Sequence, residues 1–183
     1  MTGARAHALN ARLTTPRLTL EPLVAAHADA LFPVLMDPET QRWIAPLKAR
    51  TLEALRARWG DLESRRSPDG TEAQLAWAVR RSADGAYIGK LDAVVDDAGV
   101  ATNLGYVFSP RCWGQGYATE AVGALVAHLL RAGVTELHAR VTDGNDASCR
   151  VLEKLHFARA GVIVGGDVIQ GVPHDDLLFV RRG

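Results

Sequence analysis

A glycine-bearing loop carries the clearest chemical signal in this sequence. Gly114 and Gly116 follow Arg111 and directly precede an apolar helical pattern that begins at residue 117. A loop that leads into a helix leaves backbone N–H groups at the positive end of the helix dipole, where they bind phosphate. Each glycine lets the backbone approach a ligand closely, and Arg111 can add a charge-assisted hydrogen bond. The loop therefore predicts a site for a phosphate or pyrophosphate group.

The sequence does not match two other kinds of nucleotide-binding loop, because particular residues differ from those that each loop requires. A P-loop ends in Gly-Lys-Ser/Thr, but the Gly-Lys pair of this chain is followed by Leu91. A dinucleotide fingerprint needs glycine or alanine where Thr119 stands, and an acid after the next parallel strand, where Thr142 stands. The alternative left open by the loop alone is a glycine-rich turn that only begins a core helix.

The surrounding pattern predicts the elements that position this loop. Alternating apolar residues predict strands and apolar residues at helical spacing predict helices. The expected strands cover residues 17–22, 75–79, 87–95, 100–108, 137–141, 158–164 and 176–181. The expected helices cover residues 25–36, 51–66, 117–132 and 146–155. An antiparallel meander is thus followed by a helix and a strand, which is typical of a crossover to a parallel neighbour.

These elements predict an α/β fold in one domain. We expect a flexible leader over residues 1–14 and a single domain over residues 15–183. Its sheet should be mixed but mostly antiparallel, with about seven strands and about four helices.

Composition excludes several function classes. The 21 basic and 21 acidic residues balance, so no global charge attracts nucleic acid or an anionic membrane. No apolar run is long enough to cross a bilayer. Cys112 and Cys149 form neither a disulfide framework nor a metal spacing, and reduced thiols in a cytoplasmic protein are expected. The run His174-Asp175-Asp176 is interpreted as a turn at the start of a strand, so no metal is expected.

Two separate motifs resemble the GNAT superfamily of N-acetyltransferases. Arg111, Gly114 and Gly116 match its Arg/Gln-x-x-Gly-x-Gly/Ala signature, and residues 113–121 (WGQGYATEA) are similar to its RimJ/RimL-like branch, which acetylates ribosomal-protein N-termini. Residues 145–157 (NDASCRVLEKLHF) are similar to a second motif of that branch. The resemblance covers nearly the whole chain and implies two central parallel strands that splay apart around acetyl-CoA.

The resemblance also implies which residues bind acetyl-CoA. Val107 and Phe108 would offer backbone groups to the pantetheine arm, and Asn145 would bond the cofactor's amide or a water. The pyrophosphate would lie against Arg111, Cys112, Trp113, Gly114, Gln115, Gly116, Tyr117 and Ala118.

The catalytic groups are less fully implied, because the chain departs from the family pattern. Many relatives carry a tyrosine where Leu152 stands, so Ser148 becomes the candidate that protonates or hydrogen-bonds the leaving sulfur. Relatives often have glutamate where Asn103 stands, and asparagine accepts no proton. Asp92 and Asp167 are the candidate bases, with a water chain as the remaining alternative.

The resulting hypothesis is direct acetyl transfer from acetyl-CoA to a primary amine, either a protein N-terminal α-amine or a small amine. A longer acyl-CoA and a catalytically silent CoA-binding sensor remain alternatives. The acceptor pocket is expected between Gln41 and Asp84, and a homodimer would be consistent with the resemblance. His156, in place of a glycine before Phe157, is expected to be structural.

Overall fold

The computed structural model describes residues 1–45 and 49–183 and contains an eight-stranded sheet in the order β1-β2-β3-β4-β5-β6-β8-β7. β5 and β6 pair in parallel, and the other neighbouring strands pair antiparallel. The two-residue β1 is the strand beyond the seven expected, since two residues are too few to show alternation. The strands are β1 (Leu13–Thr14), β2 (Leu18–Pro22), β3 (Ala73–Arg81), β4 (Tyr87–Val95), β5 (Val100–Phe108), β6 (Glu136–Thr142), β7 (Ala158–Ile169) and β8 (Val172–Arg182).

Six α-helices occur in the described ranges, two more than the sequence indicated. The short α3 begins at Pro38, directly after Asp37 ends α2 and caps the new helix by accepting from the Glu39 N–H. Proline is favourable in a first helical turn because its missing N–H has no partner there. The helices are α1 (Gly3–Leu9), α2 (Ala28–Met36), α3 (Pro38–Gln41), α4 (Leu52–Asp61), α5 (Tyr117–Arg131) and α6 (Asp146–Lys154).

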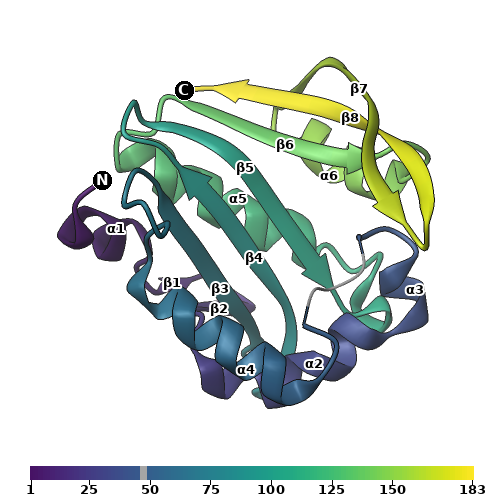
Figure 1. Cartoon of the computed structure of the whole chain (residues 1–183). Helices are drawn as coiled ribbons and strands as arrows, with labels where there is room; N and C mark the ends of the chain where they lie inside the picture. The colour runs from purple at the N-terminus through teal and green to yellow at the C-terminus, as the bar shows by residue number, and fades with distance from the viewer. Residues whose placement is uncertain (46–48) are drawn as a thin grey trace.

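The sheet separates two hydrophobic cores, and strand β3 shows why. Leu75, Trp77 and Val79 pack into the core that holds α5, whereas Ala76 and Ala78 pack into the core that holds α2 and α4. Successive side chains of a strand point to opposite faces, so one buried strand supplies both cores. Figure 1 shows α2 and α4 in front of the sheet and α5 behind it.

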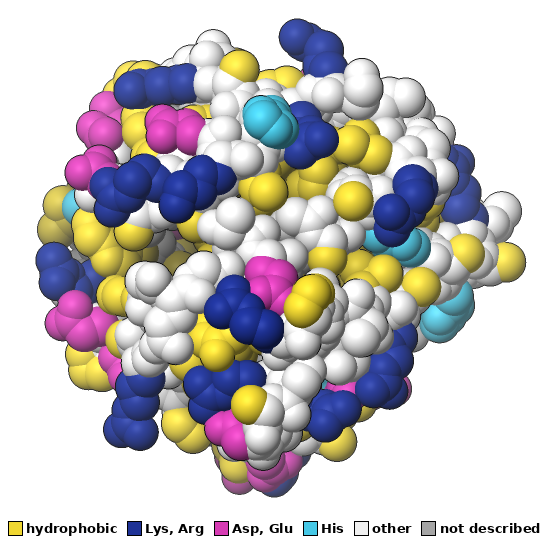
Figure 2. Space-filling view, turned by 180° about the vertical axis from the view of Figure 1, so that it is seen from behind, with side chains coloured by type: hydrophobic (Ala, Val, Ile, Leu, Met, Phe, Trp, Pro, Cys, Tyr) yellow, Lys and Arg dark blue, Asp and Glu magenta, His cyan; other side chains and the backbone are white. Residues whose placement is uncertain are grey.

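Charged side chains of both signs are interspersed on the face of the molecule that Figure 2 shows. This distribution agrees with the balanced composition of the whole chain. No helix within the described ranges is long and apolar enough to span a bilayer.

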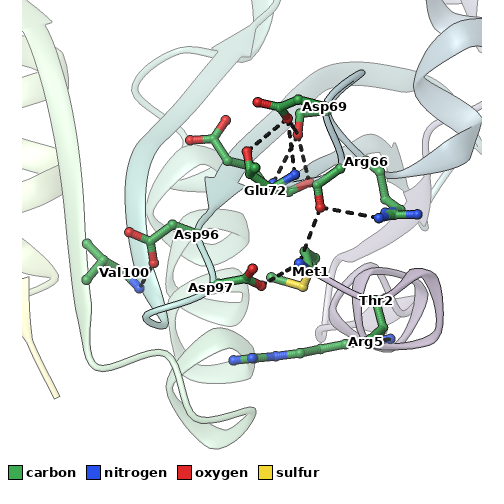
Figure 3. A network of polar contacts seen from close by, with 12 residues as sticks. Met1, Thr2, Arg5, Arg66, Asp69, Glu72, Asp96, Asp97 and Val100 are labelled. Atoms are coloured by element: carbon green, nitrogen blue, oxygen red, sulfur yellow. Dashed lines mark hydrogen bonds and ion pairs between the residues drawn. The ribbon is translucent and has the colours of Figure 1, made fainter.

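The first residues are packed rather than flexible, so the expected leader is corrected to an ordered part of the fold. Ala6 and Leu9 of α1 are 0% and 2% exposed in the core. The Leu9 carbonyl lies 2.8 Å from Nε2 of His128 on α5. The Met1 amine contacts the Asp97 carboxylate at 2.6 Å and the Gly70 carbonyl at 3.3 Å (Figure 3). The alanine-rich stretch was too short to show a helical apolar stripe by itself.

The parallel strands β5 and β6 separate along their length, as the resemblance implied. They are paired at Val100–Glu136, Ala101–Leu137 and Leu104–Ala139, after which the register pairs no further residues of these two strands. Figure 1 shows the strands diverging towards their C-terminal ends, near α3 and the β7–β8 hairpin. The splay leaves one side of the β5 backbone free of strand pairing.

Candidate functional site

A groove of about 1010 Å³ runs from the glycine loop to the far end of the splay. The loop and the first turn of α5 line one end, and β5 with the first turn of α6 lines the middle. α3 and the paired strands β7 and β8 line the other end. Because the groove joins a helix N-terminus to a cluster of polar side chains, it can hold an elongated ligand with an anionic end.

The glycine loop has the backbone that a phosphate site requires. Gly114 and Gly116 have φ values of +73° and +80°, a left-handed conformation that favours glycine. Gly116 is the N-cap of α5, and no described side chain caps this helix. The N–H groups of the first helical turn therefore have no intrahelical partner, and Tyr117, Ala118 and Thr119 line the groove there.

The predicted loop residues do not all face the groove. Cys112, Trp113, Gly114, Gly116, Tyr117 and Ala118 line it, whereas Arg111 and Gln115 do not. The Gln115 side chain instead donates to the Arg111 carbonyl at 2.9 Å, and the Arg111 side chain is exposed. The part of the loop that faces the groove thus consists of backbone and of residues other than the arginine that the sequence motif emphasises.

Arg17 braces this loop from the start of β2, a role that sequence reasoning missed. Its guanidinium donates to the Glu120 carboxylate at 2.6 Å and to the Gln115 carbonyl at 3.0 Å. It also stacks over the Tyr117 ring, 4.5 Å from the ring centroid. Glu120 further accepts from the Thr15 hydroxyl at 2.6 Å. Nothing local in the sequence links residues so far apart in the chain.

Val107 and Phe108, the two predicted pantetheine contacts on β5, direct their backbone groups to opposite sides of the strand. The Ser109 N–H donates to the Ile88 carbonyl of β4 at 2.8 Å. Alternate residues of a strand direct their backbone groups to the same side, so Val107 also faces β4. The expectation for Val107 is therefore wrong, and Tyr106 and Phe108 face the gap instead. The Phe108 carbonyl already accepts from Nε1 of Trp113 at 2.9 Å, which leaves its N–H towards the gap.

Asn145 caps α6 and also lines the groove. Its side-chain oxygen accepts from the Ser148 N–H at 3.2 Å, and this bond fixes the first turn of the helix. Leu152, where many relatives carry a tyrosine, is fully buried in the core. Any hydroxyl delivered to the groove by this helix therefore comes from its first turn.

Ser148 is joined to a tyrosine on β5 that sequence reasoning did not select. The Tyr106 hydroxyl lies 2.7 Å from Oγ of Ser148 and donates to the Ser148 carbonyl at 3.1 Å. Burial raises the pKa of Tyr106 to about 12, although the Ser148 hydrogen bond opposes this. The phenol is therefore protonated at neutral pH. A tyrosine two residues before the strand end was visible in sequence, but its partner was not.

The two predicted bases differ in their surroundings. Asp92 forms an ion pair with Lys90, which lies on the same face of β4, and both line the groove with the exposed Asn103. Asp167 lines the groove near the β7–β8 hairpin, and its Oδ1 accepts from the Val168 N–H at 2.8 Å. Both aspartates therefore line the same groove, but Asp92 is paired with a lysine whereas Asp167 accepts only from a backbone N–H.

Asp176 also lines the groove, although the sequence had suggested that it lies in a turn at the start of a strand. It lies inside β8, opposite Thr142 of β6, and is 5% exposed. Burial raises its pKa, and Asp167 adds to this effect. The expected strand already began at residue 176, but only the register and the burial show that this side chain points inward.

The remaining observations concern two single residues, possible metal ligands and the expected acceptor region. His156 has a φ of +62°, so it occupies the left-handed helix end as expected. Cys149 is half-buried, and burial raises the pKa of its thiol. Within the described ranges, no three His, Cys, Asp or Glu side chains are grouped so as to hold a metal ion. Residues 46–48 of the expected acceptor region lie outside the described residues.

Comparisons with known proteins agree with this geometry. Residues 17–158 match the family model described as an acetyltransferase (GNAT) domain. The uncharacterized N-acetyltransferase YoaA of Bacillus subtilis (strain 168) is 24% identical over 169 residues, which cover 91% of this chain and 94% of that protein.

Solved structures share the fold at low sequence identity. Ribosomal-protein-S5-alanine acetyltransferase from Vibrio fischeri superposes with a TM-score of 0.80 at 16% identity, covering 94% of this chain and 96% of that one. RimL, a ribosomal L7/L12 alpha-N-protein acetyltransferase in complex with coenzyme A, superposes with a TM-score of 0.79 at 19% identity. That match covers 94% of this chain and 98% of the RimL chain.

Proposed function

The chain belongs to the GNAT family of acetyltransferases, and we propose that it moves an acetyl group from acetyl-CoA directly to a primary amine. The observation that carries this proposal is the single groove between β5 and β6. It connects the uncapped N-terminus of α5 with the Tyr106–Ser148 pair and with a group of aspartates. One ligand can therefore present its anionic end to the helix and its reactive end to the polar groups.

The backbone of the loop is suited to the pyrophosphate of acetyl-CoA. The N–H groups from Gly114 to Thr119 would bind the phosphate oxygens, with the helix dipole adding to the attraction. The Phe108 and Tyr106 backbone groups that face the gap would pair with the pantetheine amides. Asn145 would contribute its side-chain nitrogen, since its oxygen already caps α6.

The reaction needs a base, an oxyanion stabiliser and a proton donor for sulfur. The acceptor ammonium loses a proton to a carboxylate, for which Asp167 and Asp92 are the candidates carried from the sequence. The neutral amine then attacks the thioester carbonyl, the C–S bond breaks, and the thiolate takes a proton. Ser148 is proposed for that last step. The Tyr106 hydroxyl lies within hydrogen-bond distance of its Oγ, and when the protonated phenol donates to Oγ, the serine hydrogen is free to be donated to the sulfur.

We further propose that the acceptor is the α-amine of a protein or peptide. The S5-alanine acetyltransferase and RimL act on ribosomal proteins by name, and both match over almost their entire length. The groove also extends past the Tyr106–Ser148 pair to residues of α3, β7 and β8, and we propose that the acceptor binds in this part. We propose a cytoplasmic location on the same grounds of similarity.

A turnover assay tests this proposal. The intact protein is mixed with acetyl-CoA and a panel of amines that includes peptides with free N-termini, polyamines and amino acids, and thiol release is measured. Release that depends on one amine class supports the proposal and identifies the acceptor. Calorimetric binding of acetyl-CoA without turnover on any amine would instead favour a CoA-binding sensor, and turnover only with longer acyl-CoA would correct the donor.

A further inference from the structure

Asp176 occupies a position where a carboxylate is costly to keep. It lies opposite Thr142 of β6 on one side and Ile163 of β7 on the other, and it is 5% exposed. Among the residues that the structure describes, its side chain has no hydrogen-bond or ion-pair partner. Carboxylates of residues buried to this extent are ordinarily paired. The oxygens of Asp176 are not sealed in the core but are open to the groove that the residue lines, so an unpaired acceptor faces the candidate site.

The β7 backbone is shaped around this side chain. The β7–β8 register breaks between Ile163 and Asp167, and within the break Gly165 donates its N–H to Oδ1 of Asp175 at 2.8 Å. A Cβ atom added to Gly166 would lie 2.8 Å from Oδ2 of Asp176. β-Bulges commonly re-aim side chains beside active sites. Here the bulge and a glycine leave room for the carboxylate without giving it a polar partner.

The charged groups around Asp176 come from all three strands of this region. Burial raises the pKa of Asp176, Asp167 of β7 and Asp175 of β8 raise it further, and Arg140 of β6 and His174 of β8 oppose them. A carboxylate with a raised pKa binds a proton more readily than an ordinary aspartate does. It therefore has more of the proton affinity that a base needs near neutral pH.

We propose that Asp176 is the general base that takes the proton from the acceptor ammonium, an assignment that rests on the amine acetylation proposed above. An N–H bond of the ammonium breaks and its proton moves to the Asp176 carboxylate. The freed electron pair attacks the thioester carbonyl, and the C–S bond breaks as the intermediate collapses. The amine nitrogen loses a second proton, and the thiolate takes up a proton from the Tyr106–Ser148 hydroxyls or from water. Asp176 then releases its own proton to water.

Asp92 and Asp167, the candidates carried from the sequence, have surroundings that suit this step less well. Lys90 already neutralises Asp92. Asp167 accepts from the Val168 N–H and is only half-buried. Asp167 instead contributes its negative charge beside Asp176, where it strengthens the base and attracts the ammonium group.

The decisive experiment compares Asp176→Asn with Asp167→Asn and Asp92→Asn in the thiol-release assay, as kcat/KM against pH. Wild-type kcat/KM should rise with pH as Asp176 loses its proton. Asp176→Asn should lower kcat/KM by about 100-fold and remove that acid limb. Acetyl-CoA affinity should change less than about twofold, because the proposed step involves the other substrate. If the wild type is active and the plot of kcat/KM against pH for Asp176→Asn has the same height and shape as that of the wild type, the assignment is overturned.

A weakly basic acceptor separates a base from a structural residue. An O-alkylhydroxylamine is neutral at neutral pH and needs no base before attack, so Asp176→Asn should recover most of the wild-type rate with it. The variant should also melt no lower than the wild type at neutral pH. The pKa of Asp176 is higher in the folded chain than in the unfolded one, so stability falls as pH rises between those two pKa values, and asparagine avoids that loss. No recovery together with a lower melting temperature would contradict the assignment.

Two glycines on β7 provide a matched control. Gly166→Ala places a methyl group against Asp176 and should lower kcat/KM at least tenfold. Gly161→Ala, on the same strand with no atom within 4 Å of the added Cβ, should leave it unchanged. Equal effects would contradict the proposal. A wild-type protein that binds acetyl-CoA but acetylates no amine would refute the proposed function itself, and this assignment with it.

Discussion

The hydroxyl of Tyr106 on β5 lies 2.7 Å from Oγ of Ser148 in the first turn of α6. These residues stand on the two sides of the splayed gap, so the contact joins β5 to α6 at the middle of the groove. Tyr106 also brings a phenol to this site from β5. Leu152 stands at the position on α6 where many relatives carry a tyrosine. The protonated phenol has a single hydrogen to donate. When it donates to the Ser148 carbonyl, Oγ of Ser148 donates to the phenol oxygen; when it donates to Oγ, the serine hydrogen can point into the groove.

This pairing predicts coupled effects on catalysis. Ser148→Ala should lower kcat by about 10- to 100-fold with little change in acetyl-CoA affinity, because the hydroxyl acts on the leaving sulfur. Tyr106→Phe should lower kcat less, and the double variant should be no slower than Ser148→Ala. Steady-state kinetics on the four proteins provide the double-mutant cycle. Additive losses would show that the two hydroxyls act independently, and full kcat in Ser148→Ala would leave the serine as a structural residue.

The glycine loop predicts a loss of cofactor affinity that depends on position. Gly116→Val should weaken acetyl-CoA binding tenfold or more, about 1.4 kcal/mol, because a side chain there separates the backbone from the pyrophosphate. Gly133→Val is the control at the other end of α5, where φ is +87° against +80° at Gly116. Both variants strain the backbone, but only the first should alter the calorimetric affinity. A folded Gly116→Val protein with normal affinity would refute the loop assignment.

The Arg17–Glu120 brace predicts a pH dependence. Burial alone would raise the pKa of Glu120, but hydrogen bonds from Thr15 and Arg17 outweigh it and hold the pKa below its ordinary value of 4.5. A carboxyl with a lowered pKa stabilises the fold above pH 4.5, and this contribution disappears as pH falls through the folded-state pKa.

Glu120→Gln should therefore lower the free energy of unfolding at neutral pH by about 1–2 kcal/mol and flatten its decline in acid. Acetyl-CoA affinity should also fall a few-fold, since Arg17 positions the Gln115 carbonyl. Denaturant titrations across pH, with Glu39→Gln as an exposed control, test this expectation. Parallel stability curves for wild type and Glu120→Gln would show that the brace contributes nothing.

Asn145 predicts a separation of stability from binding. Asn145→Ala should cost about 1 kcal/mol of stability, because the Ser148 N–H loses its cap. Asn145→Ser restores a capping oxygen and should recover that stability, but it lacks the side-chain nitrogen proposed to contact acetyl-CoA. Thermal melts and calorimetry on both variants distinguish the roles. Normal affinity in the serine variant would leave Asn145 as a helix cap alone.

The sequence by itself determined the parts of the protein that depend on local pattern. The loop glycines, the long helix after them and the meander before them follow from spacing and period, because such signals lie within a few neighbouring residues. The two motifs also indicated the family, the splayed strands and the position of Ser148. The same local logic failed for α1 and α3, which are short and take their stability from packing against the rest of the chain.

Only the tertiary structure decided which polar groups meet. Strand register determined that Val107 faces β4 and that Phe108 faces the gap, and a one-residue change in register would exchange them. The contacts of Tyr106 with Ser148 and of Arg17 with Glu120 join residues distant in sequence. Asp176 stood in a run of polar residues that suggested a turn, and its burial arises from β6 and the bulged β7 on either side of it. Long-range pairing sets these relationships, so no local pattern could have contained them.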